Sequence, residues 1–246
     1  EAAISDLELP RSTSGWGWTS IALGRLAAEA RNPRAATFHF TEALDCFELV
    51  GDTAGIAAAA CWKARVERSR NDLLMAIRLA ADAGSPEVEG WARLTLARDD
   101  MRAIGDHTAC LLQLDRAMQL AHLHDYPLLG YNSSLLRAEI MLQGNWLGQS
   151  AFPEDEIVRL LDDAGRFSRQ LTAAVYVNDV LSVTTTCHLH YSRWDLARQS
   201  IIAQLEFSQR TEDCVVVAEA VLMAAVLLFE RGHRALARRL TTEAGP

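Results

Sequence analysis

Lysine is almost missing from this chain of 246 residues, in which Lys63 is the single lysine among 24 basic residues. The net charge is −8, so the chain as a whole lacks the excess of positive charge that nucleic-acid binding demands. The one basic cluster contains Arg231, Arg234, Arg238 and Arg239. We interpret it as a set of cations that stabilise the end of a last helix, and we expect no direct contact with nucleic acid.

Several motifs of enzymes and membrane proteins are also missing. No GxGxxG, no GxSxG and no phosphate-binding GxxxxGK loop occurs, and no nucleophile stands beside a base that would activate it. No apolar run reaches the ~18 residues of a membrane span, and no signal peptide opens the chain. These absences predict a cytoplasmic protein that makes no membrane contact, needs no cofactor and is not an enzyme.

Proline and glycine are scarce, at 6 and 14 residues, whereas the strong helix formers alanine, leucine and arginine dominate. Half of the residues are apolar, which is enough to bury a core. One stretch, 173–190, is rich in β-branched residues and contains Thr184, Thr185 and Thr186 in a row. Its apolar residues recur every three or four positions, so we predict a helix whose threonine hydroxyls bond back to the preceding turn. The fold class is therefore predicted to be all-α.

Histidine and cysteine are present without metal-site spacing. His188 and His190 lie two residues apart, as do His122 and His124, and such pairs diverge by about 200° on a helix. We therefore expect no metal site. The five cysteines show no CxxC spacing, and we interpret them as small buried apolar residues in a reducing compartment. They are Cys46, Cys61, Cys110, Cys187 and Cys214.

We interpret a short break followed by a small residue as a recurring unit, as in Arg31-Asn32-Pro33 before Ala36, with Gly144-Asn145-Trp146 before Gln149 as a looser instance. The spacing of these anchor residues averages close to 40, which predicts about six antiparallel helix hairpins in one superhelical array. The anchors are Ala36, Met75, Cys110, Gln149, Ala197 and Ala237. We assign residues 1–13 to a lead-in segment and 14–246 to a single helical-repeat domain. The first residue is Glu, so we expect a fragment of a larger protein.

The repeats resemble the tetratricopeptide type in a divergent form. The first unit carries Leu23-Gly24, Ala36, Phe40 and Ala43, the small and large residues that this motif places where its two helices cross. The period exceeds the usual ~34 residues of that family. Longer repeats of this kind are similar to those of bacterial signal-transduction ATPases and of maltose-regulator-type activators of the LuxR family. The resemblance implies a bacterial regulator whose first helices of each hairpin line a concave binding surface.

The candidate ligand- or partner-binding residues lie on those first helices, at positions expected to face inward or, for Asn178 and His190, among the polar residues of the stretch 173–190. They are Trp18, Arg25, Asp99, Tyr131, Asn178, Asp179, Ser182, Thr186 and His190. Only Arg25 among them is basic, which disfavours a clamp for chaperone carboxylates. A groove of this kind suits a protein or peptide partner or a small-molecule effector. We expect the domain to sense that ligand within a transcription regulator. The alternatives are a constitutive scaffold that self-associates as a homodimer and, less favoured, a helical enzyme domain.

Overall fold

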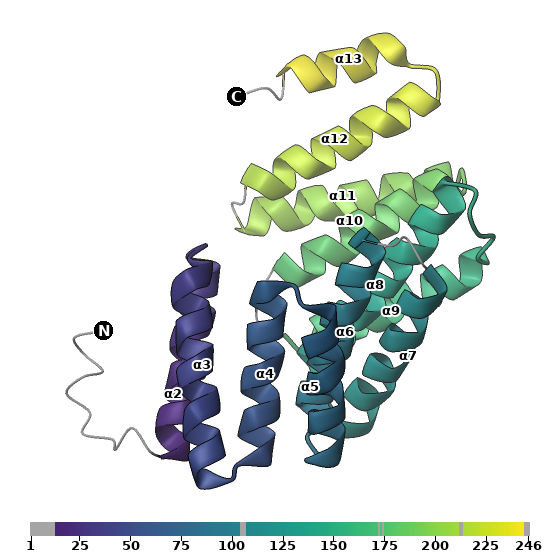
Figure 1. Ribbon diagram of the computed structural model, residues 1–246. Helices are drawn as coiled ribbons and strands as arrows, with labels where there is room; N and C mark the ends of the chain where they lie inside the picture. Colours follow the sequence, from purple (N-terminus) through teal and green to yellow (C-terminus); the bar gives the residue numbers. More distant parts are fainter. Residues whose placement is uncertain (1–12, 104–106, 172, 174, 212–213, 244–246) are drawn as a thin grey trace. The chain divides into compact units, whose positions relative to one another are not determined.

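The computed structural model describes residues 13–103, 107–171, 173, 175–211 and 214–243 of the chain. Twelve helices account for nearly all of these residues, and no strand occurs in the described ranges (Figure 1). The all-α fold class predicted from the sequence is therefore confirmed. No helix in this part of the chain is long and apolar enough to cross a membrane.

The helices follow one another with short connections. They are α2 (Ser14–Glu29), α3 (Pro33–Val50), α4 (Thr53–Glu67), α5 (Arg70–Asp82), α6 (Pro86–Ala103), α7 (His107–His124), α8 (Pro127–Trp146), α9 (Glu154–Ser168), α10 (Val175–His190), α11 (Trp194–Thr211), α12 (Cys214–Glu230) and α13 (Arg234–Glu243). The β-rich stretch predicted to be helical forms α10, so that prediction is confirmed.

The chain divides into two compact units, with the boundary inside α8 between Leu129 and Gly130. In the first unit each helix from α2 to α7 packs against the next, and α4 also contacts α2 and α6. In the second unit the helices from α9 to α13 pack in sequence, and α10 also contacts α12. Alternate helices thus contact each other in both units, in addition to their neighbours in the chain.

Local capping explains where several helices begin. The side chains of Thr13, Asn32, Asp52 and Ser69 each accept a hydrogen bond from the backbone N–H three residues further on, which satisfies a donor that the helix leaves free. Pro153 directly precedes the first residue of α9 and has an extended backbone conformation.

Five alternate helices, α3, α5, α7, α9 and α11, share one buried pattern at their fourth, eighth and eleventh residues. This spacing places the three side chains on a single helix face. The buried sets are Ala36, Phe40 and Ala43 in α3; Leu73, Ile77 and Ala80 in α5; Cys110, Leu114 and Ala117 in α7; Ile157, Leu161 and Ala164 in α9; and Ala197, Ile201 and Gln204 in α11. The eleventh residue is alanine four times and Gln204 once.

Two of the six anchors inferred from the sequence were wrong. Met75 is exposed, and Leu73 occupies the buried position, because Ser69 caps α5 two residues earlier than the Arg70-Asn71-Asp72 break implied. Gln149 lies in a loop, and the buried position belongs to Ile157 of α9. The other four anchors are buried at the fourth position of their helices.

Close approach of the helices depends on glycines that face large side chains. A Cβ added at Gly24 of α2 would lie 2.5 Å from Cε1 of Phe40 in α3, so only glycine fits there without a shift. A Cβ at Gly130 of α8 would likewise lie 2.5 Å from the ring of Phe167 in α9. The small-against-large crossing inferred for the first hairpin is therefore present. Four of the five cysteines are buried as predicted, but Cys214 is exposed at the first position of α12.

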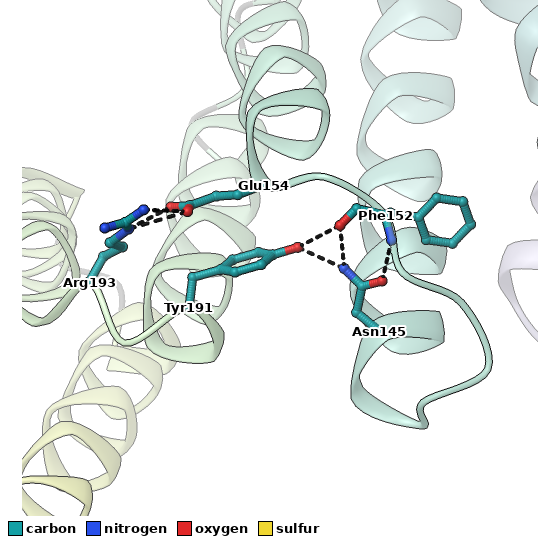
Figure 2. Close-up of polar contacts among 5 residues, drawn as sticks. All are labelled: Asn145, Phe152, Glu154, Tyr191 and Arg193. Carbon is teal, nitrogen blue, oxygen red and sulfur yellow. Dashed lines mark hydrogen bonds and ion pairs between the residues drawn. The ribbon is translucent and has the colours of Figure 1, made fainter.

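The connection between α8 and α9 is closed by the side chain of Asn145 (Figure 2). Its Oδ1 accepts from the backbone N–H of Phe152 over 2.7 Å, and its Nδ2 donates to the carbonyl oxygen of Phe152 over 2.9 Å. The Tyr191 hydroxyl, after the end of α10, lies 2.7 Å from the same Nδ2 and donates to the Phe152 carbonyl. Arg193 adds a two-pronged ion pair with Glu154. These contacts hold the start of α9 against the end of α10.

Candidate functional site

Polar side chains gather in the second unit at the first half of α10. Asn178 is buried with 4% of its surface exposed, although its neighbours on α10 include apolar Val177 and Val180. Thr185 lies two helical turns further along and is also buried, so the two polar residues share one face of the helix. A helix face that buries Asn178 must supply hydrogen-bond partners for it, because an unpaired buried amide is costly.

The Tyr131 hydroxyl of α8 donates a hydrogen bond to Oδ2 of Asp179 over 2.9 Å. Tyr131 is 3% exposed, and its ring meets the Tyr176 ring edge-on, with centroids 4.9 Å apart. Asp179 is half-buried. The bond therefore joins the buried Tyr131 of α8 to Asp179 of α10, whose side chain still reaches water.

Burial, and then the Asp179 charge, raises the pKa of the Tyr131 hydroxyl above its ordinary value, so the hydroxyl stays protonated and donates. Burial is also the main reason why the pKa of the Asp179 carboxyl is raised. The hydrogen bond from Tyr131 acts in the opposite direction, and the nearby charge of Glu219 raises the Asp179 pKa further. Two carboxylates, Asp179 and Glu219, thus lie close enough to repel each other.

Asn178 connects α10 to the next two helices. Its Nδ2 donates to Oε2 of Glu219 in α12 over 3.0 Å, and its Oδ1 accepts from Nε2 of Gln204 in α11 over 3.4 Å. Gln204 is fully buried, and its Oε1 has no hydrogen-bond partner within the described residues. We call the group formed by Tyr131, Tyr176, Asn178, Asp179, Gln204 and Glu219 the polar cluster.

The polar cluster is rich in acceptors and poor in cations. Asp179 and Glu219 form no ion pair with a basic side chain in the part of the chain that the structure describes. Oδ1 of Asp179 and Oε1 of Glu219 accept no hydrogen bond from those residues either. The arrangement can therefore accept several hydrogen bonds from a ligand and attract positive charge.

Three of the nine candidate residues thus come together, namely Tyr131, Asn178 and Asp179. Sequence reasoning missed Tyr176, Gln204 and Glu219. A signal for Gln204 was available, because it occupies the eleventh position of α11, where α3, α5, α7 and α9 carry alanine. That signal required the correct first residue of each of these helices, and two of the anchors predicted from the sequence were misplaced.

Other candidates on α10 have local roles. The Thr186 hydroxyl donates to the carbonyl oxygen of Ser182 over 3.0 Å, and Thr185 makes the equivalent bond to Leu181, as expected for helical threonines. Ser182 lies one turn beyond Asp179 and is half-buried. His190 lies about 16 Å further along the helix axis than Asp179. Its ring lies between those of Trp146 and Tyr191, with centroids 6.4 and 4.8 Å away.

The remaining three candidates belong to the first unit. Trp18 is 46% exposed and meets the ring of Phe47 edge-on. Arg25 is exposed, and its guanidinium lies 4.7 Å from the ring centroid of Trp62, at a cation–π distance. Asp99 is half-buried, and its Oδ2 is buried without a hydrogen-bond partner within the described residues.

An open groove of about 450 Å³ lies between α9 and α10 in the second unit. Its polar lining consists of Asp162, Arg166, Arg169, Thr184 and His188. Burial lowers the pKa of the His188 imidazole, so the ring favours its neutral form. Arg166 forms an ion pair with Asp163.

No group of three or more His, Cys, Asp and Glu side chains with the arrangement of a metal site occurs among the residues that the structure describes. No protein-family model matches the sequence, and no curated protein matches it.

Proposed function

We propose that this chain is a helical-repeat binding module that holds a protein or peptide partner, or a small effector, at the polar cluster of its second unit. The observation that carries the proposal is the hydrogen bond between Tyr131 and Asp179, together with the link from Asn178 to Glu219. These bonds connect α8, α10 and α12, three alternate helices. Oδ1 of Asp179 and Oε1 of Glu219 accept no hydrogen bond from the described residues and remain available to a ligand.

The contacts between alternate helices support a stacked array of hairpins of the tetratricopeptide type. In such arrays the first helices of successive hairpins lie side by side and form one continuous surface. The contacts of α4 with α2 and α6, and of α10 with α12, follow this pattern. In this proposal α8, α10 and α12 form the binding surface of the second unit, which is where the polar cluster lies.

The resemblance to bacterial regulators supplies the proposed setting. We propose a cytoplasmic sensor domain of a transcription regulator, in which ligand binding shifts the population of two states of the whole protein. The ligand must then bind one state more tightly than the other. In this proposal the difference in affinity comes from the oxygens of the polar cluster that accept no hydrogen bond from the described residues.

Photo-crosslinking tests the proposal. A photo-reactive amino acid is placed at Ser182, one turn from Asp179, and the protein is irradiated in its own cells. We expect an adduct of defined mass, of protein size or of ligand size, that is lost in the Asp179→Ala Glu219→Ala variant. The control position is Leu112, which is 67% exposed on α7 in the first unit. Equal adducts from both positions, or none from Ser182, would overturn the proposal.

A self-association module is the second candidate, and exposed apolar side chains on the last two helices favour it. Leu222 and Phe229 of α12 and Leu236 of α13 are 54%, 52% and 47% exposed. Sedimentation at two protein concentrations distinguishes the candidates. A dimer that forms with rising concentration, together with no adduct at Ser182, supports the scaffold.

A further inference from the structure

The charge balance of the polar cluster is the starting point for the ligand's chemistry. Asp179 and Glu219 interact as like charges, and the electrostatic environment of Asp179 contains no compensating basic side chain. Like charges held together in a half-buried place destabilise each other unless a cation lies between or beside them. Within the described residues that cation is missing, because neither carboxylate forms an ion pair.

Gln204 provides a second, independent observation. It is fully buried where four other hairpins bury alanine, so its amide is there at the expense of apolar packing. Its Nε2 donates to Asn178, whereas its Oε1 has no partner. Both atoms belong to one amide group, so the unpartnered oxygen lies beside Asn178 within the polar cluster. It is an acceptor that lacks a donor, as are the free oxygens of Asp179 and Glu219.

The aromatic rings of the cluster suit the same kind of ligand. Tyr131 and Tyr176 meet edge-to-face 4.9 Å apart, and Asp179 is held at the hydroxyl end of Tyr131. A cation over an aromatic face gains electrostatic attraction from the ring, and more so where water is excluded. Tyr176 is half-buried and precedes Asp179 by three residues on α10, so the two side chains lie on the same side of the helix.

We propose that the polar cluster binds a compact organic cation, a guanidinium or ammonium group, that donates hydrogen bonds to Asp179 and Glu219 and lies beside the ring of Tyr176. The proposal rests on the function proposed above and gives the chemical class of its ligand. Asn178 holds the Glu219 carboxylate through its Nδ2, and Gln204 holds Asn178 through its own Nε2. The cation belongs either to an arginine or lysine side chain of a peptide partner or to a free amine, and the chemistry at the cluster is the same in both cases.

The test is an NMR titration of the full chain with four probes. The peptide probe is acetyl-Gly-Arg-Gly-amide, and its control replaces arginine by citrulline, which keeps the shape but removes the charge. The small-molecule probes are butylguanidinium and butylammonium. We expect the arginine peptide or a butyl cation to shift the side-chain amide signals of Asn178 and Gln204, and the citrulline peptide to leave them unchanged. Stronger binding of the peptide indicates a peptide partner, and equal binding of butylguanidinium indicates a free amine.

Two variants test the assignment of residues. Asp179→Asn and Glu219→Gln each remove one charge with almost no change of volume, and each should weaken cation binding more than about tenfold. Glu206→Gln is the matched control, because Glu206 is an exposed carboxylate on α11 outside the cluster. Its affinity should equal that of the original chain. Unfolding by urea shows whether each variant is folded. If Asp179→Asn does not fold, Glu219→Gln alone carries the test.

The proposal is overturned if no cationic probe shifts the Asn178 and Gln204 signals, if citrulline binds as well as arginine, or if both charge variants bind as the original chain does. Its failure differs from that of the proposed function. If an adduct forms at Ser182 but no cationic probe binds, the proposed class of ligand is wrong and the proposed binding function stands. Loss of both results overturns both.

Discussion

The hydroxyl of Tyr131 lies 2.9 Å from Oδ2 of Asp179, and this one hydrogen bond joins a buried aromatic side chain of α8 to a half-exposed carboxylate of α10. The two residues are 48 positions apart in the chain. Burial of the tyrosine fixes where the hydroxyl points, and the hydroxyl in turn fixes one oxygen of the carboxylate. The other oxygen is left for a ligand, so the same bond contributes to stability and prepares a binding site.

Removing the hydroxyl should destabilise the chain. In Tyr131→Phe the ring stays, but Asp179 loses its donor, and we expect the free energy of unfolding to fall by about 1 to 2 kcal/mol, because a half-exposed carboxylate recovers part of the bond from water. Urea unfolding measures it. Tyr176→Phe is the control, since the Tyr176 hydroxyl forms no hydrogen bond within the described residues. An equal loss in both variants contradicts the assignment.

The charge of Asp179 should make stability fall as the pH rises. The pKa of this carboxyl is raised from its ordinary 3.8, mainly by burial. The folded chain therefore binds the proton more tightly than the unfolded chain, and the Asp179 contribution is lost as the pH climbs from about 3.8 through the folded pKa. Tyr131 and Glu219 face the group, and Tyr131 stays protonated throughout this range.

Comparison with Asp179→Asn isolates this effect, because the other carboxyls titrate in both proteins. One of them, Glu154, has a lowered pKa, first because of its hydrogen bond with Arg193. Its contribution to stability therefore rises with pH, but it does so equally in the original chain and in the variant. We expect the unfolding free energy of the original chain, relative to the variant, to decrease as the pH rises above about 4, the ordinary pKa of an aspartate. A relative stability that rises with pH would refute the raised pKa.

Sequence patterns predicted the helices well but located the repeat register only in part. The period of apolar residues predicted α10 despite its valines and threonines, since a helix buries every third or fourth side chain. The two wrong anchors, Met75 and Gln149, arose where a side chain decides the boundary. Ser69 begins α5 early, and Asn145 remains in the last turn of α8 while its side chain binds Phe152.

In the candidate site too, local sequence patterns predicted some residues and missed others. Tyr131 and Asp179 were among the candidates because local periodicity alone predicted them at inward positions, and Asn178 was named as a polar residue of the same stretch as Asp179. Gln204 and Glu219 were missed because their importance comes from contacts across 26 and 41 residues of sequence. A pattern along one helix carries no information about which residue of another helix it meets.

The crossing of α2 and α3 gives a packing prediction. Gly24→Ala places a methyl group against the Phe40 ring, and overpacking of this kind costs roughly 1 to 3 kcal/mol, which exceeds the gain of ~1 kcal/mol in helix propensity. Thermal or urea unfolding should show a net loss. Gly15→Ala in the same helix is the control, because its Cβ would meet only Oγ1 of Thr13, at 3.8 Å. If both variants are equally stable, the Phe40 ring moves aside freely.

Asn145 provides the last prediction, because its amide makes three hydrogen bonds at the loop between α8 and α9. Asn145→Ala leaves the N–H of Phe152 without its acceptor, and we expect a loss of about 1 to 3 kcal/mol in unfolding free energy. The Phe152 amide should also exchange its hydrogen faster. Gln149→Ala, in the same loop, should change neither quantity, since the Gln149 side chain is exposed.

Asn145→Asp separates the role of the acceptor from that of the donor. Aspartate keeps the oxygen that accepts from the Phe152 N–H but replaces the donating Nδ2 with a second oxygen, which then faces the Phe152 carbonyl. Two acceptors repel each other there, and the hydroxyl of Tyr191 can donate to only one of them. We therefore expect Asn145→Asp to be no more stable than Asn145→Ala at neutral pH. A stability close to that of the original chain would mean that the bond from the Phe152 N–H alone closes the loop.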